Sequence, residues 1–447
     1  MNEVNFQANK AWGSACLWLA FLGPFFYLTY GFANWLANQQ TNVDSVVFAW
    51  EYNIPFMAWT IIPYWSINLF YAASLFVCAN PLALNIHVKR LVTAQIIAVS
   101  CFILLPLHFT FDRPTTSGLP GLMFDALASF DKPFNQAPSL HIALAIILWV
   151  LYIKHLPNKY WHYTLHLWFS LVVVSVLTTF QHHFIDIPTG ALLGWFCVWL
   201  WPDNNHCILK SSDGAYKKQR YRLGTYYLLG ALLPTLVAIL VGGASLWLLW
   251  VSTALTLVAS CYFFIGVDGF QKQANGQLSL AARWLLFPYL IGAFINSRLW
   301  TRKQPAPVQV YEQLWLGRFP SNASLISHNF QAVVDLSAEM TLSSRSNTAI
   351  KWYSIPCLDL IPPTAESLYQ AITAIDKALK SGKTLVCCAL GYSRSVAALA
   401  AWLEGTGQAT NTDSAISMIK LQRPEIVINE VTAKVIHHAA TLYKDNV

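Results

Sequence analysis

The stretch KTLVCCALGYSRSVA, residues 383–397, decides the fold of the C-terminal part of this chain. Its first half is apolar and predicts a buried strand that ends at Cys388, and the helical pattern SVAALAAWLEG follows Arg394. Gly391 lies in the loop between them. A loop between a strand end and a helix start directs backbone amides and a helix N-terminus at one point. The pattern therefore predicts a binding site for a dianion.

The residues at the two ends of this loop suit phosphate chemistry. A thiolate at Cys388 is stabilised in such a positive environment and can attack phosphorus, while Arg394 can hold two phosphate oxygens at once. Asp359 lies upstream in CLDLIPPTAES and is a suitable proton donor for the leaving oxygen. Cys387 and Cys388 also allow a metal pair or a redox pair. The first lacks further ligands at metal-binding spacing, and the second needs a strained disulfide.

The pattern around the loop predicts one soluble α/β domain over residues 304–447. Three further stretches read as strands and one as an amphipathic helix, followed by polar-capped helices from residue 408 onward. The strands are VQVYEQLWLG (308–317), QAVVDLS (331–337) and AIKWYSIP (349–356), and the helix is TAESLYQAITAIDKALK (364–380).

This domain resembles the dual-specificity branch of the cysteine-dependent phosphatases, including small lipid-directed members similar to mitochondrial phosphatidylglycerophosphate phosphatase. The resemblance covers about residues 308–445, through LWLGRFP, AVVDLSAE, the Asp359 loop, CALGYSRS and LQRPEIVIN. The family has His directly before its nucleophile, where this chain has Cys387, which implies a less stabilised thiolate and slower turnover. The resemblance implies no metal or cofactor. It implies these roles: nucleophile Cys388, phosphate ligands Arg394 and Gly391, general acid Asp359, and Ser395 as the hydroxyl that helps the thiolate leave.

The composition of the whole chain is that of a membrane protein. Of 447 residues, 55% are hydrophobic and only 11% are charged, and the mean hydropathy is +0.43. The net charge of +7 is spread in short runs between apolar segments, so it indicates membrane topology rather than a nucleic-acid partner. The expected partners are the lipid bilayer and phosphorylated lipids, and the composition does not define an oligomeric state.

Apolar runs long enough to span a bilayer precede the soluble domain. A spanning helix needs about 20 apolar residues. A ninth run, at 284–295, is short and contains Pro288 and Gly292, so it predicts an interfacial or re-entrant segment instead of a span. The eight predicted spans lie near 12–35, 55–78, 91–111, 139–153, 165–180, 184–201, 223–243 and 245–267.

Basic residues predict the orientation of these spans. Lys and Arg follow the second, fourth and sixth spans and recur between 272 and 303, which places these loops and the C-terminal domain in the cytoplasm. An even number of spans satisfies this arrangement. We therefore expect a multi-pass protein of the plasma membrane, or the inner membrane of a bacterium, with the loops after the odd-numbered spans on the non-cytoplasmic face.

Three short stretches in these non-cytoplasmic loops carry ionisable residues at helix ends. They are FDRP (111–114), NQAPSLHIA (135–143) and TTFQHHFIDIPTG (178–190). Ionisable residues at membrane depth are costly to bury and mark functional sites. Two histidines, one aspartate and one arginine are the set that a phosphohistidine mechanism needs.

The three stretches resemble, in order and spacing, the type 2 phosphatidic acid phosphatase superfamily, especially its PSLH branch with inositolphosphorylceramide synthase-like phosphotransferases. The match covers roughly residues 50–201. It implies five roles: nucleophile His182, its partner Asp186, general acid His141, and the phosphate ligands Ser139 and Arg113.

Two phosphate-binding cations of this family are missing here. Pro106 and Val176 stand where the family has Lys and Arg, and Lys132 in SFDKPFN is a candidate substitute. His183 stands where the family has Tyr and receives no catalytic role. These departures leave two alternatives to an active site: a degenerate site without turnover, and histidines that only cap helices.

The sequence thus predicts a multi-pass α-helical membrane domain followed by a soluble α/β cysteine-phosphatase domain. The parts are a six-helix lipid-phosphatase-like core (1–222), two additional helices with an interfacial segment (223–303), and the dual-specificity phosphatase-like domain (304–447). The expected function is a bifunctional membrane phosphatase for phosphorylated lipids. The alternatives are a lipid headgroup phosphotransferase, a membrane-anchored protein tyrosine phosphatase, and a non-catalytic lipid phosphate-binding scaffold.

Overall fold

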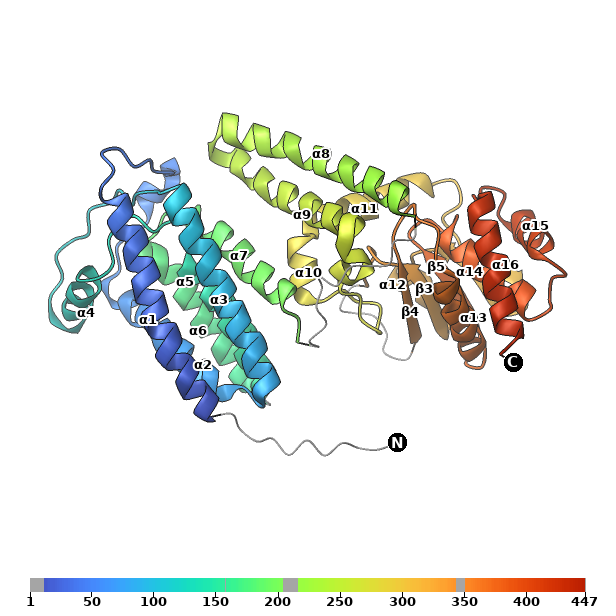
Figure 1. Ribbon diagram of the computed structural model, residues 1–447, viewed down its shortest axis with the longest axis horizontal. Coiled ribbons are helices and arrows are strands. Elements are labelled where there is room, and N and C mark those ends of the chain that lie inside the picture. Colours follow the sequence, from blue (N-terminus) through green and yellow to red (C-terminus); the bar gives the residue numbers. More distant parts are fainter. Residues whose placement is uncertain (1–11, 157, 204–215, 343–349, 447) are drawn as a thin grey trace. The chain divides into compact units, whose positions relative to one another are not determined.

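The computed structural model of the protein describes residues 12–156, 158–203, 216–342 and 350–446 (Figure 1). These residues form two compact units, Met1–Cys207 and Ile208–Val447. The second unit contains both the last apolar helices and the α/β domain. The three-part division at 222 and 303 stays a prediction.

The described part of the first unit is helical. Its α-helices are α1 (Trp12–Ala37), α2 (Ile61–Val77), α3 (Pro81–Leu104), α4 (Gly118–Ala128), α5 (Leu140–His155), α6 (Lys159–Thr178) and α7 (Asp186–Leu200). Of these, α4 lies where the sequence predicted no helix. The others lie at the first six predicted spans, with ends shifted by up to ten residues.

Six helical segments in the described chain are long and apolar enough to cross a membrane by length and composition. They are Trp12–Ala37, Ala58–Val77, Pro81–Leu104, Lys159–Thr178, Lys217–Val241 and Gly243–Phe270. The two remaining predicted spans correspond to α5 and α7, which have 16 and 15 residues. At 1.5 Å per residue each is about 24 Å or less in length, against a hydrocarbon core of about 30 Å.

Glycine lets α5 and α7 approach each other closely. Gly190 and Gly194 are one turn apart on α7, and a Cβ on them would lie 2.4 Å from the carbonyl oxygen of Ser139 and 2.9 Å from that of Ala143. Only a residue without a side chain permits this contact, as in small-xxx-small helix pairs. The contact fixes the start of α7 beside the start of α5.

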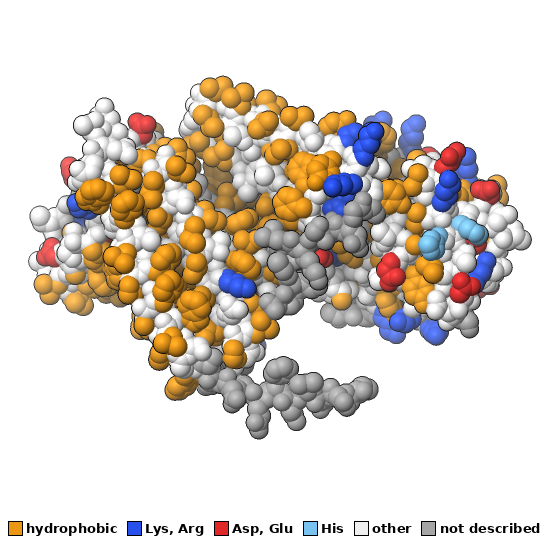
Figure 2. Space-filling view, in the orientation of Figure 1, with side chains coloured by type: hydrophobic (Ala, Val, Ile, Leu, Met, Phe, Trp, Pro, Cys, Tyr) orange, Lys and Arg blue, Asp and Glu red, His pale blue; other side chains and the backbone are white. Residues whose placement is uncertain are grey.

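The second unit begins with an apolar helical hairpin. Helix α8 (Lys217–Val241) returns through α9 (Leu248–Ser260) and a π-helical turn (Cys261–Ile265), and α10 (Leu280–Leu285) and α11 (Phe287–Trp300) follow. Figure 2 shows hydrophobic side chains over α8, whereas charged side chains gather on the α/β domain. The short run predicted at 284–295 is divided between the end of α10 and α11. Helix α11 exposes large apolar side chains: Phe287, Ile291, Phe294, Ile295, Leu299 and Trp300.

The α/β domain contains a five-stranded mixed sheet in the order β1-β2-β5-β3-β4. The strands β1 (Val308–Tyr311) and β2 (Leu314–Arg318) are antiparallel, and β2, β5 (Thr384–Cys388), β3 (Ala332–Ser337) and β4 (Lys351–Cys357) are parallel. The predicted strands at 331–337, 349–356 and 384–388 and the predicted helix are confirmed, whereas the stretch 308–317, predicted as one strand, forms the two antiparallel strands β1 and β2. The helices are α12 (Asn322–Ser327), α13 (Ala365–Leu379), α14 (Arg394–Gly405), α15 (Thr412–Gln422) and α16 (Glu430–Lys444).

The two faces of the sheet have different covers. Helices α13 to α16 pack their apolar sides on one face. On the other face, Lys272, in the loop after the hairpin, forms an ion pair with Asp335 on β3, with Nζ 2.7 Å from Oδ2 and both side chains fully buried. The same loop binds the α/β domain again where the Leu278 amide donates to Thr341 Oγ1 at 3.1 Å. The loop is therefore part of the domain's core.

The buried Lys272–Asp335 pair generates a stability prediction. Lys272→Met leaves the Asp335 carboxylate buried without its cation, and we expect the unfolding free energy of the second unit to fall by about 3–5 kcal/mol. Denaturant unfolding of the full chain in detergent measures the loss. Lys303→Met, at an exposed lysine, is the control and should change it by less than about 0.5 kcal/mol. Equal effects of both substitutions would contradict the structural role of the pair.

Candidate functional site

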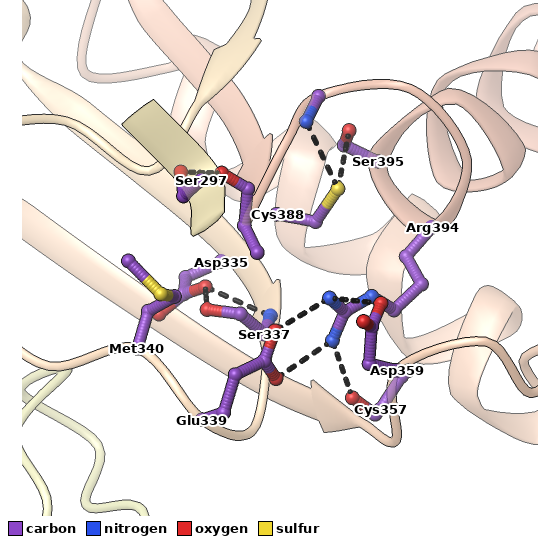
Figure 3. A network of polar contacts seen from close by, with 12 residues as sticks. Ser297, Asp335, Ser337, Glu339, Met340, Cys357, Asp359, Cys388, Arg394 and Ser395 are labelled. Carbon is purple, nitrogen blue, oxygen red and sulfur yellow. Dashed lines mark hydrogen bonds and ion pairs between the residues drawn. The ribbon is translucent and has the colours of Figure 1, made fainter. Parts of the chain in front are cut away.

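The loop from Cys388 to Arg394 wraps around the cysteine sulfur (Figure 3). Strand β5 ends at Cys388 and α14 begins at Arg394. The Gly391 amide donates to Cys388 Sγ at 3.2 Å, and Ser395 Oγ lies 3.2 Å from the same sulfur. Donors aimed at sulfur stabilise its negative charge. The structure thus brings the predicted nucleophile together with Gly391 and Ser395.

Gly391 has a backbone conformation and a packing environment that only glycine satisfies. Its φ is +75°, and a Cβ would lie 2.5 Å from the carbonyl carbon of Gly317 on β2. The loop therefore lies directly against the neighbouring strand. This close approach holds the Gly391 amide towards the sulfur.

Arg394 is buried and holds two carboxylates. Its Nη1 and Nη2 donate to the two oxygens of Glu339 at 2.9 and 2.6 Å, and Nη2 also donates to Asp359 Oδ1 at 2.8 Å. The carbonyl oxygen of Cys357 accepts a further bond from Nη1 at 2.8 Å. The predicted general acid and phosphate ligand thus lie in contact. Glu339, which anchors the guanidinium, was not predicted from sequence, because nothing in AVVDLSAE marks it as the partner of a residue 55 positions away.

These contacts shift the pKa values of the three groups in different directions. Burial raises the pKa of the Asp359 carboxyl; Arg394 opposes this effect and Glu339 adds to it, so the net pKa is raised. Burial also favours neutral Glu339, yet the Arg394 charge lowers its pKa overall. The pKa of Arg394 is raised because the two carboxylates outweigh its burial. Of the two carboxyls, Asp359 is the one suited to carry a proton.

Cys387 lies on the opposite side of the strand from Cys388. Its side chain packs in an apolar cluster with Phe319, Phe330 and Val333, whereas Cys388 belongs to the core under α13 and α14. Burial raises the pKa of the Cys387 thiol well above its usual range. The side chain therefore fills the second core and does not face the phosphate loop.

The residues predicted for the phosphohistidine mechanism also converge, within the first unit. His182 Nδ1 lies 3.0 Å from Asp186 Oδ2, and His182 Nε2 lies 3.3 Å from Ser139 Oγ. Asp186 begins α7 and Ser139 caps the N-terminus of α5, where its Oγ accepts from the Ile142 amide. The close packing of Gly190 on the start of α5 brings the Ser139, His182 and Asp186 side chains next to each other.

Two cavities meet at His182. One, of about 430 Å³, has mixed polar walls that include Arg113, Lys132 and His108. The other, of about 230 Å³, is more apolar and is lined by His141, with tyrosine and leucine side chains. The Nε of Arg113 and the Nε2 of His141 are buried and have no hydrogen-bond partner among the described residues. Lys132, the candidate substitute for a missing cation, thus shares a cavity with Arg113.

His183 is held by different partners from its neighbour. Its Nδ1 lies 3.1 Å from Glu51 Oε2, and its Nε2 lies 3.2 Å from the amide nitrogen of Thr110. Glu51 also accepts from the Phe184 amide at 2.9 Å. Glu51 was missed from sequence, since it lies more than 130 residues before the histidines. It fixes the loop that carries His182.

Comparison with known proteins identifies only the C-terminal part. The model of the dual-specificity phosphatase catalytic domain matches residues 314–440, and this part of the chain is such a domain, a phosphoric monoester hydrolase. No curated protein matches the chain.

Solved structures match about a third of the chain. The crystal structure of PTPMT1 is 18% identical, with 31% of this chain and 97% of that chain covered and a TM-score of 0.27. PTPMT1 in complex with PI(5)P matches with the same identity and TM-score, covering 31% of this chain and 96% of that chain. Human DUSP28 is 22% identical, with 32% and 95% covered and a TM-score of 0.26.

The close approach at Gly391 predicts a selective loss of activity. We expect Gly391→Ala to lower kcat for para-nitrophenyl phosphate at least about tenfold, a loss of ~1.4 kcal/mol in transition-state stabilisation, because a Cβ 2.5 Å from the carbonyl carbon of Gly317 forces the loop away from β2. Gly407→Ala is the matched control: its φ is +77°, but a Cβ there meets nothing within 4 Å. If both variants retain full activity, the loop does not depend on this contact.

The raised pKa of Asp359 predicts a pH dependence for substrates with poor leaving groups. A general acid must be protonated, so kcat/KM for alkyl phosphates should fall as pH rises through the raised Asp359 pKa. Asp359→Asn should lower this rate by about 10²–10⁴-fold and remove that limb of the profile. A pH series with wild type and variant checks both effects. An unchanged limb in the variant would assign the proton to another group.

Proposed function

We propose that this chain, whose residues 314–440 form a dual-specificity phosphatase catalytic domain, is a membrane phosphatase that removes phosphate from phosphorylated lipids. The principal reaction is assigned to Cys388. A second reaction is assigned to His182 in the first unit. Neither mechanism uses a metal or a cofactor.

The first step at Cys388 is phosphoryl transfer to sulfur. The Cys388 thiolate attacks phosphorus, the P–O bond to the lipid breaks, and Asp359 gives its proton to the leaving oxygen. The loop amides and Arg394 bind the equatorial oxygens. Water then attacks the phosphocysteine, the Asp359 carboxylate accepts a proton from it, and Ser395 donates a hydrogen bond to the departing thiolate. The products are the lipid alcohol and inorganic phosphate.

Contacts between the catalytic loop and the apolar helices of the same unit are the main support for a lipid substrate. On α11, Ser297 Oγ donates to the carbonyl oxygen of Ala389 at 2.5 Å and is fully buried. From the π-helical turn, Tyr262 Oη donates to the carbonyl oxygen of Asp359 at 3.0 Å. A catalytic loop tied to helices of this kind stays at the membrane surface when the hairpin is inserted. Tethering then raises the effective concentration of lipid substrates over soluble ones.

The second reaction is supported by the hydrogen-bonded chain Ser139–His182–Asp186. Asp186 on Nδ1 favours the tautomer with a lone pair on Nε2, which suits Nε2 as the nucleophile of a phosphohistidine mechanism. Arg113 and Lys132 supply positive charge in the adjoining cavity, and His141 is the proton donor. The PSLH-type resemblance also includes phosphotransferases, so an alcohol in place of water at this step is the alternative reaction.

The distribution of basic residues supports the topology of this proposal. It assigns the Cys388 domain to the cytoplasm and the His182 site to the non-cytoplasmic face of a plasma or bacterial inner membrane. Two other functions compete with lipid hydrolysis. They are a membrane-anchored protein tyrosine phosphatase and a scaffold that binds lipid phosphate without turnover.

Two nucleophile substitutions test the proposed function. With full-length protein in detergent, we expect Cys388→Ser and His182→Ala each to lower phosphate release from at least one of phosphatidic acid and phosphatidylglycerophosphate by at least about 100-fold, because each removes a covalent route. The controls are Cys387→Ala, on the opposite side of β5, and His166→Ala, at an exposed histidine.

The outcomes separate the competing functions. Wild-type levels of lipid hydrolysis in both nucleophile variants would refute the proposal. Preference for phosphotyrosine peptides over both lipids would favour the anchored protein phosphatase. Transfer of a labelled headgroup to an added alcohol would favour the phosphotransferase. Binding of these lipids without any phosphate release would favour the scaffold.

A further inference from the structure

A cavity of about 270 Å³ lies beside the catalytic loop within the second unit. Three helices outside the phosphatase domain contribute most of its walls. Its lining residues are Tyr227 on α8, Val251 and Leu255 on α9, Pro288, Tyr289, Gly292, Ala293 and Asn296 on α11, and Glu339, Asp359, Ala389 and Leu390 of the phosphatase domain.

One wall of the cavity belongs to the catalytic site itself. Ala389 and Leu390 are the first two residues after the nucleophile, and Asp359 is the proton donor of the proposed reaction. The Asp359 side chain is 34% exposed although it binds Arg394. A group that leaves phosphorus and takes the Asp359 proton therefore stands at this cavity.

Apolar and small residues of the preceding helices form part of the lining: Val251 and Leu255 on α9, and Pro288, Gly292 and Ala293 on α11. Tyr227, Tyr289 and Asn296 add polar groups to it. A Cβ on Gly292 would meet nothing within 4 Å, so no packing requirement holds glycine there. Helix α11 also exposes an apolar surface next to these positions, which includes Ile291 and Phe294. The cavity is thus bounded by the helices assigned to the membrane and its interface.

The charges in the cavity restrict what can lie next to the phosphate. Glu339 and Asp359 are the ionisable acids in its lining, and the lining contains no lysine or arginine. The lining offers no cation of its own to a second phosphate or another anionic group, because the nearby Arg394 is already paired with Glu339 and Asp359. An apolar chain on a neutral glycerol backbone fits, because it buries apolar surface against α9 and α11.

We propose that this cavity, named here the acyl slot, receives the lipid part of a phosphate monoester attached directly to the hydrophobic alcohol, as in phosphatidic acid. Its volume of about 270 Å³ is slightly below the range of about 300–1,000 Å³ that is usual for ligand pockets. It therefore holds the glycerol backbone and the first part of one chain, and the remaining chain length stays in the bilayer. The inference rests on the proposed lipid phosphatase function of Cys388 and specifies its substrate class.

The test fills the acyl slot without touching the catalytic residues. All variants carry His182→Ala, so that only the Cys388 site contributes. In this background we expect Gly292→Leu to lower kcat/KM for dioleoyl phosphatidic acid in mixed micelles at least tenfold, while kcat/KM for para-nitrophenyl phosphate changes less than twofold. The soluble substrate also reports whether the variant is folded.

The matched control places similar bulk next to the slot. Ile291→Phe enlarges an exposed side chain on α11 that does not line the cavity, and it should leave both rates within twofold of the background. In the same background, phosphatidic acid should be a better substrate than phosphatidylglycerophosphate and phosphatidylinositol phosphate, whose phosphate monoesters stand on large hydrophilic headgroups.

The possible failures are distinguishable. Hydrolysis of para-nitrophenyl phosphate but of none of the three lipids would overturn the proposed function at Cys388. Lipid hydrolysis that Gly292→Leu leaves unchanged would overturn the acyl slot and leave the lipid phosphatase function standing. A preference for either large-headgroup lipid would overturn the inferred substrate class.

Discussion

The catalytic half of this protein depends on the neutralisation of one buried charge. The Arg394 guanidinium is almost completely buried. Both of its outer nitrogens donate to Glu339, and one of them also donates to Asp359. Removing such a charge from water costs several kcal/mol unless carboxylates compensate it. These ion pairs hold the residues after β3, the loop after β4 and the start of α14 together. These three elements therefore meet at the predicted phosphate site.

The same network assigns different tasks to two neighbouring acids. Glu339 keeps its charge and orients the arginine, whereas Asp359 has a raised pKa and an exposed edge beside the acyl slot. Because Glu339 occupies Arg394, the cavity offers no free cation to a second anion, whereas an Asp359 that carries a proton serves the leaving oxygen. Charge balance at Arg394 thus links the proposed chemistry to the proposed substrate class, a lipid whose only ionised group near the reaction is the phosphate itself.

Local sequence pattern predicted much of this molecule. The alternating and apolar runs around Cys388 gave the strands, the loop and α14, because these elements are specified by neighbouring residues. The motifs around His141 and His182 predicted a constellation that the structure does bring together in space. Glu339, Glu51 and Lys272 were missed, since each acts through a partner far along the chain. Helix α4 was missed because its short apolar run lies within a loop rich in glycine and proline.

The sequence by itself determined that apolar helices precede an α/β phosphatase domain, and it predicted which cysteine, arginine and aspartate serve as its reactive set. The reason is that strand and helix periods and a loop of fixed length are local properties. Only the tertiary structure decided that α11 and the hairpin lie against the catalytic loop and that Cys387 faces the other core. It also decided that Gly190 joins Ser139 to His182. These relations depend on the close packing of distant backbones, which the spacing of residues along the chain does not encode.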